Sequence, residues 1–499
     1  MKNIFVFVIF ILLGVSVNAQ DITDALRFSS QKVHGTARYT AMGGAFGALG
    51  GDISAISINP ASSAVFINNK FSGSLDLNAT DSDSFYGGGF NATSESDFDL
   101  NQIGAVFVFE SNNVNALFNK LSLGFTYNRT NAFDDQLRFQ GNNSQSVSDF
   151  FLGNAQGIPL DLLTPRSGES VADLYQFLGE QEGFGPQQAF LGYESFLINA
   201  VNPSDLDNTS YVSNVNGVNF TQNYYQTTFG NSGKYTLNGG GMIGDNIHLG
   251  LNVNIHYLDY ARNTFYDEFN SASTGITDVF FDNELRTRGS GISFQLGGIA
   301  KLTQSWRLGL TYDSPTWMEI SDELFQRLET VNASGDVALI DTGVLNVYPD
   351  YQFKTPGRLS VSTAYVFGGS GLISFDYSYK DFSAMEFSSE GFTNQNQDIS
   401  GLMTTASTFN VGGEYRLQNT TFRAGYFLQQ SPYINKDFLG DTTGYSFGLG
   451  YAFGNTTLDF SYQRVEQDRQ NILYFTGFNQ EARVQSIFNN YMLTLSFNL

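Results

Sequence analysis

The last residues of the chain place a large apolar side chain at every second position from 491 to 499. The apolar members are Tyr491, Leu493, Leu495, Phe497 and Leu499, and the small polar residues Thr494, Ser496 and Asn498 stand between them. Successive side chains of an extended strand point to opposite faces, so this period of two gives the strand one apolar and one polar face. Many earlier segments repeat the pattern, and a hydrophobic leader precedes them. Together these features predict an all-β chain that forms a closed, transmembrane antiparallel β-barrel in an outer membrane.

The composition supports β-structure and excludes several classes of function. The 499 residues include 47 Phe, 26 Tyr and 52 Gly but only 9 Pro, a mixture typical of strands and tight turns. The net charge of −23 argues against a basic surface that could bind nucleic acid. The absence of cysteine excludes a disulfide scaffold, thiolate metal sites and a lipid-modified N-terminal Cys. A mean hydropathy slightly below zero argues against a helical membrane bundle, whereas a barrel exposes only alternate residues to lipid.

The first residues have the pattern of a secretory signal peptide. Lys2 supplies a positive charge, residues 4–17 are almost wholly apolar, and Val17-Asn18-Ala19 is an acceptable cleavage site. We expect the signal peptide at residues 1–19 and the mature chain from Gln20. The alternative is an uncleaved anchor, but this apolar run is shorter than the ~20 residues that a spanning helix needs.

Fourteen segments carry strand patterns, an even number as expected for a bacterial barrel. They are 70–80, 101–110, 119–130, 232–242, 245–259, 288–302, 304–314, 354–367, 371–380, 407–417, 419–429, 443–454, 455–467 and 487–498. Short links such as residues 368–370 follow the even-numbered segments, whereas long links such as 131–231, 260–287 and 315–353 follow the odd-numbered ones. This sorting is typical of tight periplasmic turns and long external loops, and it predicts that both termini lie in the periplasm. A soluble β-sandwich, the alternative, has no reason to sort its links in this way.

Residues 20–69 lie between the signal peptide and the first strand, and their glycines invite two interpretations. The run from Gly43 to Gly51 could be a dinucleotide-binding loop, but no apolar strand leads into it. The alternative is a compact, tightly turning segment that Asn59-Pro60 brings to an end. We favour the compact segment. The expected division is therefore a signal peptide at 1–19, this segment at 20–69 and a barrel at 70–499.

This segment also resembles a known family. The stretch from Gly35-Thr36-Ala37-Arg38 to Asn59-Pro60-Ala61 is similar to the N-terminal hatch of FadL-type outer-membrane transporters of hydrophobic compounds, above all of their Bacteroidetes branch. The resemblance resumes at Thr355-Pro356-Gly357-Arg358, at residues 371–377 and at residues 409–416. It implies a barrel of about 14 strands whose hatch plugs the lumen and which passes long-chain fatty acids or other hydrocarbons inward. It also implies that Asn59, Pro60 and Ala61 are structural elements of the hatch.

Two regions supply candidate ligand-binding residues. In the hatch, the apolar residues Leu26, Phe28 and Phe46 could line a pocket, or they could form the core of the hatch. In the link 131–231, apolar residues recur at helical spacing near 171–178 and 190–197, which predicts two short amphipathic helices. These helices either cap the barrel or form a groove that collects hydrophobic ligands. Their candidate contacts are Phe177, Phe190 and Phe196.

No constellation of residues points to catalysis, a metal or another cofactor. His248 and His256 stand eight residues apart, about 27 Å along a strand, and therefore cannot share a metal. No Gly-x-Ser-x-Gly motif is present, and His34 is only a sequence neighbour of two serines. The inward carboxylates Asp376, Glu414 and Asp459 have Arg307, Lys380 and Arg416 available as ion-pair partners in the lumen. Residues 80–100, rich in Asp, Ser and Gly, could bind calcium or bridge to lipopolysaccharide, but a solvated loop is the simpler interpretation.

Three functions remain open, and none of them is enzymatic. The first is passive uptake of hydrophobic small molecules such as long-chain fatty acids or hydrocarbons. The second is an accessory barrel of a secretion system that binds and shuttles secreted cargo proteins. The third is a general porin, which requires an open polar lumen and is disfavoured by the hatch. The expected partners are a hydrophobic ligand, membrane lipid and lipopolysaccharide, and secreted proteins under the second function.

Overall fold

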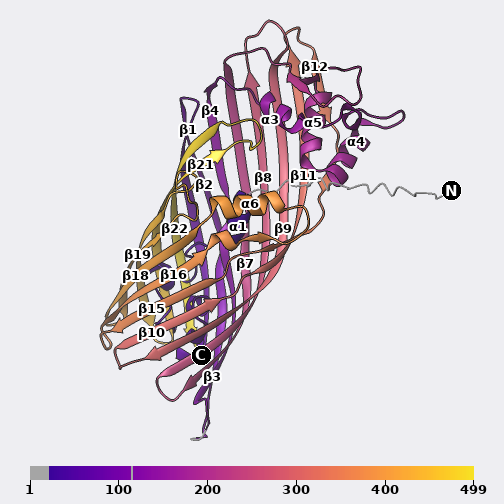
Figure 1. Cartoon of the computed structure of the whole chain (residues 1–499). Coiled ribbons are helices and arrows are strands. Elements are labelled where there is room, and N and C mark those ends of the chain that lie inside the picture. The colour runs from indigo at the N-terminus through magenta and orange to yellow at the C-terminus, as the bar shows by residue number, and fades with distance from the viewer. Residues whose placement is uncertain (1–21, 114–115) are drawn as a thin grey trace, which may run out of the picture.

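The protein is a closed barrel of fourteen antiparallel strands (Figure 1). The computed structural model describes residues 22–113 and 116–499, so the predicted signal peptide lies outside the described residues. In order around the wall, the strands are β1 (Lys70–Tyr86), β2 (Gly89–Glu110), β3 (Lys120–Ala132), β7 (Phe220–Ile243), β8 (Ile247–Phe269), β9 (Ile276–Lys301), β10 (Trp306–Asp313), β15 (Arg358–Val366), β16 (Gly371–Asp381), β18 (Thr405–Leu417), β19 (Thr420–Gln429), β20 (Thr442–Phe453), β21 (Thr456–Ile472) and β22 (Glu481–Asn498). The ring closes where β22 pairs with β1, Leu495 opposite Gly73. The predicted barrel and all fourteen predicted strand positions are confirmed.

The strands are much longer than the sequence patterns indicated, and three predicted loops were wrong. Residues 80–100 continue the β1–β2 hairpin, and residues 260–287 continue β8 and β9. Residues 315–353 contain β11 (Trp317–Asn332), β12 (Val337–Asp341), β13 (Asn346–Val347) and the start of β14 (Tyr351–Lys354). The inward face of β11 does carry an apolar stripe, Met318, Ile320, Leu324 and Leu328, which the sequence analysis did not use. The extensions of β1 and β2 carry mainly polar residues, so no apolar stripe marks them as strands. Cross-strand hydrogen bonds hold them instead.

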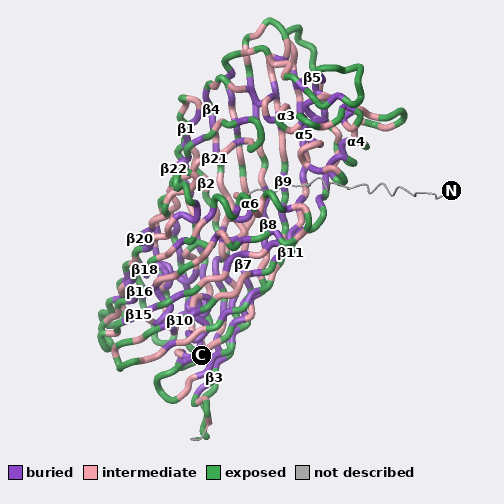
Figure 2. Tube along the Cα trace, viewed as in Figure 1, coloured by how far each residue is buried: buried purple, intermediate pink, exposed green. Residues whose placement is uncertain are grey.

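The wall is apolar outside and polar inside, the reverse of a soluble barrel. Figure 2 shows that buried and exposed residues alternate along its strands. On β22, Leu493 and Leu495 are 47% and 41% exposed, whereas Thr494 between them is 1% exposed. On β20, Leu449 faces outward and Ser446 is buried. An exposed apolar band with a buried polar interior is what a barrel shows when lipid surrounds it.

The N-terminal segment fills the inside of the barrel, and we call residues 22–66 the hatch. It contains α1 (Ile22–Ser29), α2 (Ala37–Ala41) and two short helical turns, η1 (Ser54–Ser57) and η2 (Pro60–Val65). Inward-facing glycines of the wall let its backbone approach closely. A Cβ at Gly250 would lie 2.3 Å from the Pro60 carbonyl carbon, and one at Gly425 would lie 2.1 Å from the Gly43 nitrogen. Glycine therefore serves here as the contact surface for the hatch.

The two ends of the barrel differ. The short-turn end carries tight connections such as residues 244–246 and 302–305, and the C-terminus lies there (Figure 1). At the long-loop end a cap, residues 144–219, packs over the barrel. After β4 (Asp135–Asn143), it contains α3 (Ser148–Ala155), η3 (Leu160–Leu163), α4 (Val171–Phe177), η4 (Leu178–Glu182), α5 (Phe184–Glu194), β5 (Ile198–Ala200) and β6 (Tyr211–Ser213). Near β16 lie η5 (Phe382–Ala384), β17 (Glu386–Phe387) and α6 (Thr393–Leu402).

The helices of the cap agree in part with the sequence pattern. The predicted helix at 171–178 corresponds to α4, whose start is fixed by a capping box between Ser170 and Asp173. The second helix, α5, begins at residue 184 rather than near 190. Phe151, Phe190 and Phe281 are fully buried where the cap meets β9. Among the described residues, no helix has the length and apolar content needed to cross a membrane.

Candidate functional site: a lumen cavity beside an interrupted wall

A cavity of about 190 Å³ lies inside the barrel between the hatch and the wall. The end of α1 and residues 29–34 of the hatch form one side of it. The wall contributes residues from β3, β7, β8, β9, β10, β11, β15, β16, β18 and β19. The charged and imidazole side chains that line the cavity are Lys32, His34, Arg129, Lys234, His256, Asp313, Arg358, Asp376 and Lys380.

The lining of this cavity is cationic although the whole chain has a net charge of −23. Five of its side chains are Lys or Arg and two are Asp. One carboxylate pairs with an arginine of the same lining, and the other is bound by the hatch. Asp313 accepts a hydrogen bond from Arg358 Nε at 2.5 Å, and Asp376 Oδ2 accepts from the backbone N–H groups of Phe46 and Gly47 at 2.9 and 2.8 Å. Arg358 is paired with Asp313, and Arg129 is paired with carboxylates outside the cavity, so the surplus positive charge lies on the three lysines. That charge favours an anionic group inside the cavity.

The lysines of the cavity differ in their partners. Lys380 donates to the Ser29 carbonyl oxygen at 2.6 Å and so holds the end of α1. Lys32 stands over the Phe488 ring, 4.6 Å from its centroid. Over the described residues, Lys234 takes part in no salt bridge. Its ammonium group is therefore the one most available to a ligand.

Lys32 and His34, which the hatch contributes to the cavity, have lowered pKa values. Burial lowers the pKa of His34 well below its usual range, and Arg129 and Lys32 lower it further. His34 is therefore neutral at physiological pH. The pKa of Lys32 is also lowered, because the surrounding protein partly desolvates its ammonium group. His256 Nε2 lies 2.8 Å from Ser293 Oγ, so this imidazole has a wall partner.

The side of the cavity nearest the long-loop end is apolar. Phe28 lines the cavity and contacts Phe353 edge to face, with ring centroids 5.6 Å apart. Leu26 and Phe28 pack on a cluster that includes Met318, Phe353 and Phe382. Cationic groups and an apolar cluster thus meet in one enclosed space.

The wall beside the cavity is interrupted between β2 and β3. Their ladder of paired residues ends at Gln102 and Asn128. The pairing of β3 with β7 shifts register between Arg129 and Asn131, and β4 then pairs with β7. Residues 128–131 line the cavity, so the cavity reaches this interruption. We call the stretch between β2 residues 93–101 and residues 129–136 the seam.

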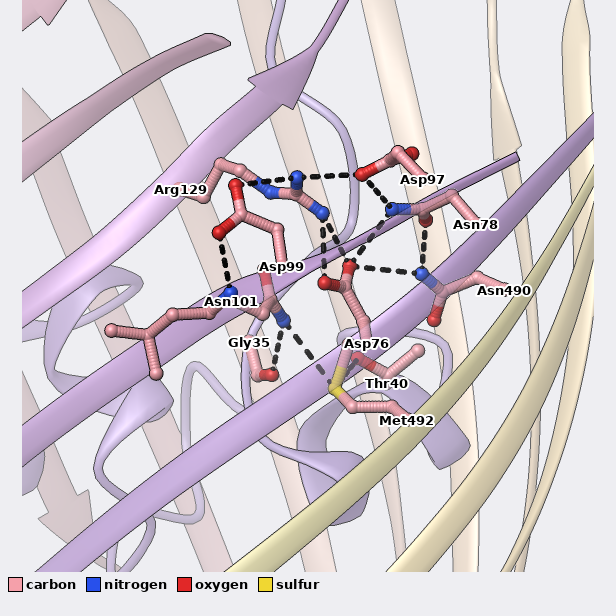
Figure 3. Close-up of polar contacts among 11 residues, drawn as sticks. Gly35, Thr40, Asp76, Asn78, Asp97, Asp99, Asn101, Arg129, Asn490 and Met492 are labelled. Carbon is pink, nitrogen blue, oxygen red and sulfur yellow. Dashed lines mark hydrogen bonds and ion pairs between the residues drawn. The ribbon is translucent and has the colours of Figure 1, made fainter. Parts of the chain in front are cut away.

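Arg129 lies at the seam (Figure 3). Its Nη1 donates to Asp97 Oδ2 at 2.9 Å and to Asp99 Oδ2 at 3.2 Å, and both of these carboxylates belong to β2. Its Nη2 donates to both oxygens of Asp76 on β1, at 2.8 and 2.7 Å. Asn490 on β22 donates to Asp76 Oδ2 at 3.2 Å. One buried guanidinium thus joins strands on both sides of the seam.

A second interruption of the wall is sealed by direct hydrogen bonds. Pro315 separates β10 from β11, and Pro356 separates β14 from β15. The Thr316 N–H donates to Thr355 Oγ1 at 2.9 Å, and the Thr355 N–H donates to the Thr316 carbonyl oxygen at 3.0 Å. This break also borders the cavity, but the two hydrogen bonds between Thr316 and Thr355 close it. The seam differs because side chains close it.

The residues proposed from sequence lie in three places. Phe28 lines the cavity and Leu26 packs on the apolar cluster beside it. Phe46 is fully buried in the core of the hatch, against Tyr39, and does not line the cavity. In the cap, Phe190 is buried, whereas Phe177 and Phe196 are 44% and 61% exposed.

The Asn59-Pro60-Ala61 triplet fastens the hatch to the wall. The Asn59 side chain donates to the carbonyl oxygens of Gly47, at 2.7 Å, and of Gly298 on β9, at 3.1 Å. Its Oδ1 accepts from the Ala61 N–H at 3.1 Å, which caps η2. Pro60 stands at the first position of η2, where its missing N–H costs nothing.

Sequence reasoning named Lys380 as an inward residue of the lumen but missed the other cationic residues of the cavity, Lys234 and Arg129 above all. A signal for them was present in the sequence: a Lys or Arg at an inward-facing position of a strand is unusual in a chain with so few basic residues, and it indicates a cationic site in the lumen. Within residues 22–113 and 116–499, no three His, Asp or Glu side chains are grouped as a metal site would require.

Comparison with known proteins identifies the family. A family model described as outer membrane protein transport protein (OMPP1/FadL/TodX) matches residues 213–498, more than half of the chain. The chain belongs to this family. OMPP1/FadL/TodX proteins are outer-membrane transport channels and not enzymes. No curated protein sequence matches the chain.

Solved structures share the fold at low identity. The crystal structure of a Pseudomonas aeruginosa FadL homologue has 12% identity and a TM-score of 0.55, over 94% of this chain and 99% of that one. The Pseudomonas putida toluene transporter TodX has 13% identity and a TM-score of 0.52, over 94% and 100%. The Ralstonia pickettii toluene transporter TbuX has 14% identity and a TM-score of 0.51, over 94% and 99%. At such identities the likeness establishes the barrel and leaves the ligand open.

Proposed function

We propose that this barrel is a passive outer-membrane channel for hydrophobic molecules that carry an anionic group, long-chain fatty acids being the simplest case. The observation that carries the proposal is the cavity, where cationic side chains and the apolar cluster around Phe28 meet. Burial of an acyl chain is favourable by about 0.8 kcal/mol per methylene. A carboxylate near Lys234 would gain a charge-assisted hydrogen bond. A neutral hydrocarbon would leave the surplus charge of the cavity uncompensated.

The ligand leaves the cavity through the seam rather than past the hatch in this proposal. Two observations support that route. The hatch is fixed to the wall by close glycine contacts and by the bonds of Asn59, so its displacement would break many contacts at once. The seam has lost its backbone ladder beside the cavity. The ligand would pass between β2 and β3 into the apolar region of the membrane.

The proposed orientation has the short-turn end and both termini in the periplasm and the cap outside the cell. Tight periplasmic turns and long external loops are general for bacterial barrels. Phe177 and Phe196, exposed on the cap, would then be the first apolar surfaces that a ligand meets.

Binding to the purified barrel tests the proposal. Native mass spectrometry would compare dodecanoate with 1-dodecanol, which share a chain length and differ in charge. We expect dodecanoate to bind more tightly and Lys234→Met to weaken its binding by about tenfold or more, as loss of a hydrogen bond worth about 1.5–3 kcal/mol requires. Lys436→Met, which removes an exposed lysine paired with Asp441 on a loop, is the matched control. Equal binding of both probes, or no binding of either, would contradict the proposal.

A further inference from the structure

Arg129 connects the cavity to the seam, and its three carboxylate partners are not equivalent. The Arg129 side chain is 1% exposed. Asp76 is fully buried and is held in place by Asn78 and Asn490, with donor–acceptor distances of 3.1 and 3.2 Å. Asp97 and Asp99 are 18% and 42% exposed. Asp76 therefore anchors the guanidinium, and the two β2 carboxylates are the contacts that can separate.

The two β2 contacts lie where the backbone ladder is missing. Between Gln102 and the tip of the hairpin, β2 has ladder partners only on β1. Apart from Arg129, the seam is bridged by the Thr93 hydroxyl, which donates to the Gln136 carbonyl oxygen at 2.6 Å. Side chains thus close this part of the wall, and Arg129 supplies two of the contacts.

The same guanidinium borders the cavity. Arg129 lines the cavity, and its Nε is a buried donor without an acceptor. A buried donor without a partner costs free energy, so an anionic group that reaches it gains a strong hydrogen bond. An anion there would also reduce the attraction of the guanidinium for Asp97 and Asp99.

We propose that Arg129 is a latch on the seam, closed by Asp97 and Asp99 and released when the anionic group of a ligand in the cavity binds the guanidinium. This inference rests on the proposed function and adds its regulation. The latch couples occupancy of the cavity to opening of the wall. A neutral molecule in the cavity would leave the latch closed, so Arg129 would determine specificity for anionic ligands.

The distance across the seam tests the latch directly. The chain has no cysteine, so a spin-label pair at Ser96→Cys and Gln136→Cys reports only this distance. Both positions are exposed and stand on opposite sides of the seam. In lipid nanodiscs we expect dodecanoate to lengthen or broaden the distance distribution and 1-dodecanol to leave it unchanged. The double variant Asp97→Asn/Asp99→Asn should show the open distribution without any ligand.

Controls separate the latch from folding and from transport. Asp83→Asn removes an exposed carboxylate of the same hairpin and should keep the closed distribution. Asp99→Asn alone, at the most exposed of the three carboxylates, should give a partial shift if the double variant fails to fold. Identical distributions in the wild type, with and without dodecanoate, and in the folded variants would overturn the latch. Binding of dodecanoate without any change across the seam would overturn the latch but keep the proposed function.

Discussion

Arg38 in the hatch and Glu414 on β18 form an ion pair with Nε and Oε2 2.8 Å apart, although 376 residues separate them in sequence. Glu414 also accepts from Arg423 Nε at 2.8 Å, and Arg423 Nη1 donates to Asp459 at 2.6 Å. The network ties α2 to the wall inside the barrel. Sequence analysis expected ion pairs for Glu414 and Asp459 in the lumen. Arg416, which it named as a partner, does pair with Glu414 at 3.2 Å, but Arg38 and Arg423 were not named.

Removing the central carboxylate should loosen the hatch. Glu414→Gln leaves Arg38 and Arg423 without their shared acceptor, and breaking a buried ion pair on one side costs about 3–5 kcal/mol. We expect faster amide hydrogen exchange in residues 37–66, with the barrel strands unaffected. Glu466→Gln, in the exposed pair with Arg464, should change exchange little. Unchanged exchange of the hatch in Glu414→Gln would show that this network does not hold it.

The glycine contacts between wall and hatch should be intolerant of a single methyl group. Gly250→Ala would place a Cβ against Pro60, and overpacking of this kind costs typically about 1–3 kcal/mol. We expect a lower midpoint of thermal unfolding or a displaced hatch. Gly239→Ala, on the neighbouring strand where a Cβ meets nothing within 4 Å, is the control. Equal midpoints and equal protease resistance of the two variants would contradict the close packing.

The strands could be predicted from the sequence wherever their outward residues face lipid, because those residues must then be apolar. β20 and β22 were found because their outward residues must face lipid and their inward residues stay small or polar. The extension of β1 and β2 through residues 80–100 was missed because it carries no apolar stripe that could reveal its period. Cross-strand pairing sets its conformation, and that information lies in its partner strand.

The residues that line the cavity were harder to predict from the sequence than the strands of the barrel. Phe28 was proposed because it is an apolar residue of the N-terminal segment, and it lines the cavity. Phe46 has the same character but is in the hatch core, since the turn at Gly43 and Gly44 directs it against Tyr39. Arg129 and its aspartates come from three strands, and only the closed ring places them together. Strand patterns alone give neither the register nor the position of the seam.

Uptake by intact bacteria tests the central claim most directly. Cells that display the protein in the outer membrane would be compared with otherwise identical cells that lack it, using radiolabelled hexadecanoate. The account predicts a faster, saturable uptake that needs no energy source for the outer-membrane step and that falls in Lys234→Met. Equal rates in the two kinds of cell, with the barrel shown to be folded in the membrane, would contradict it.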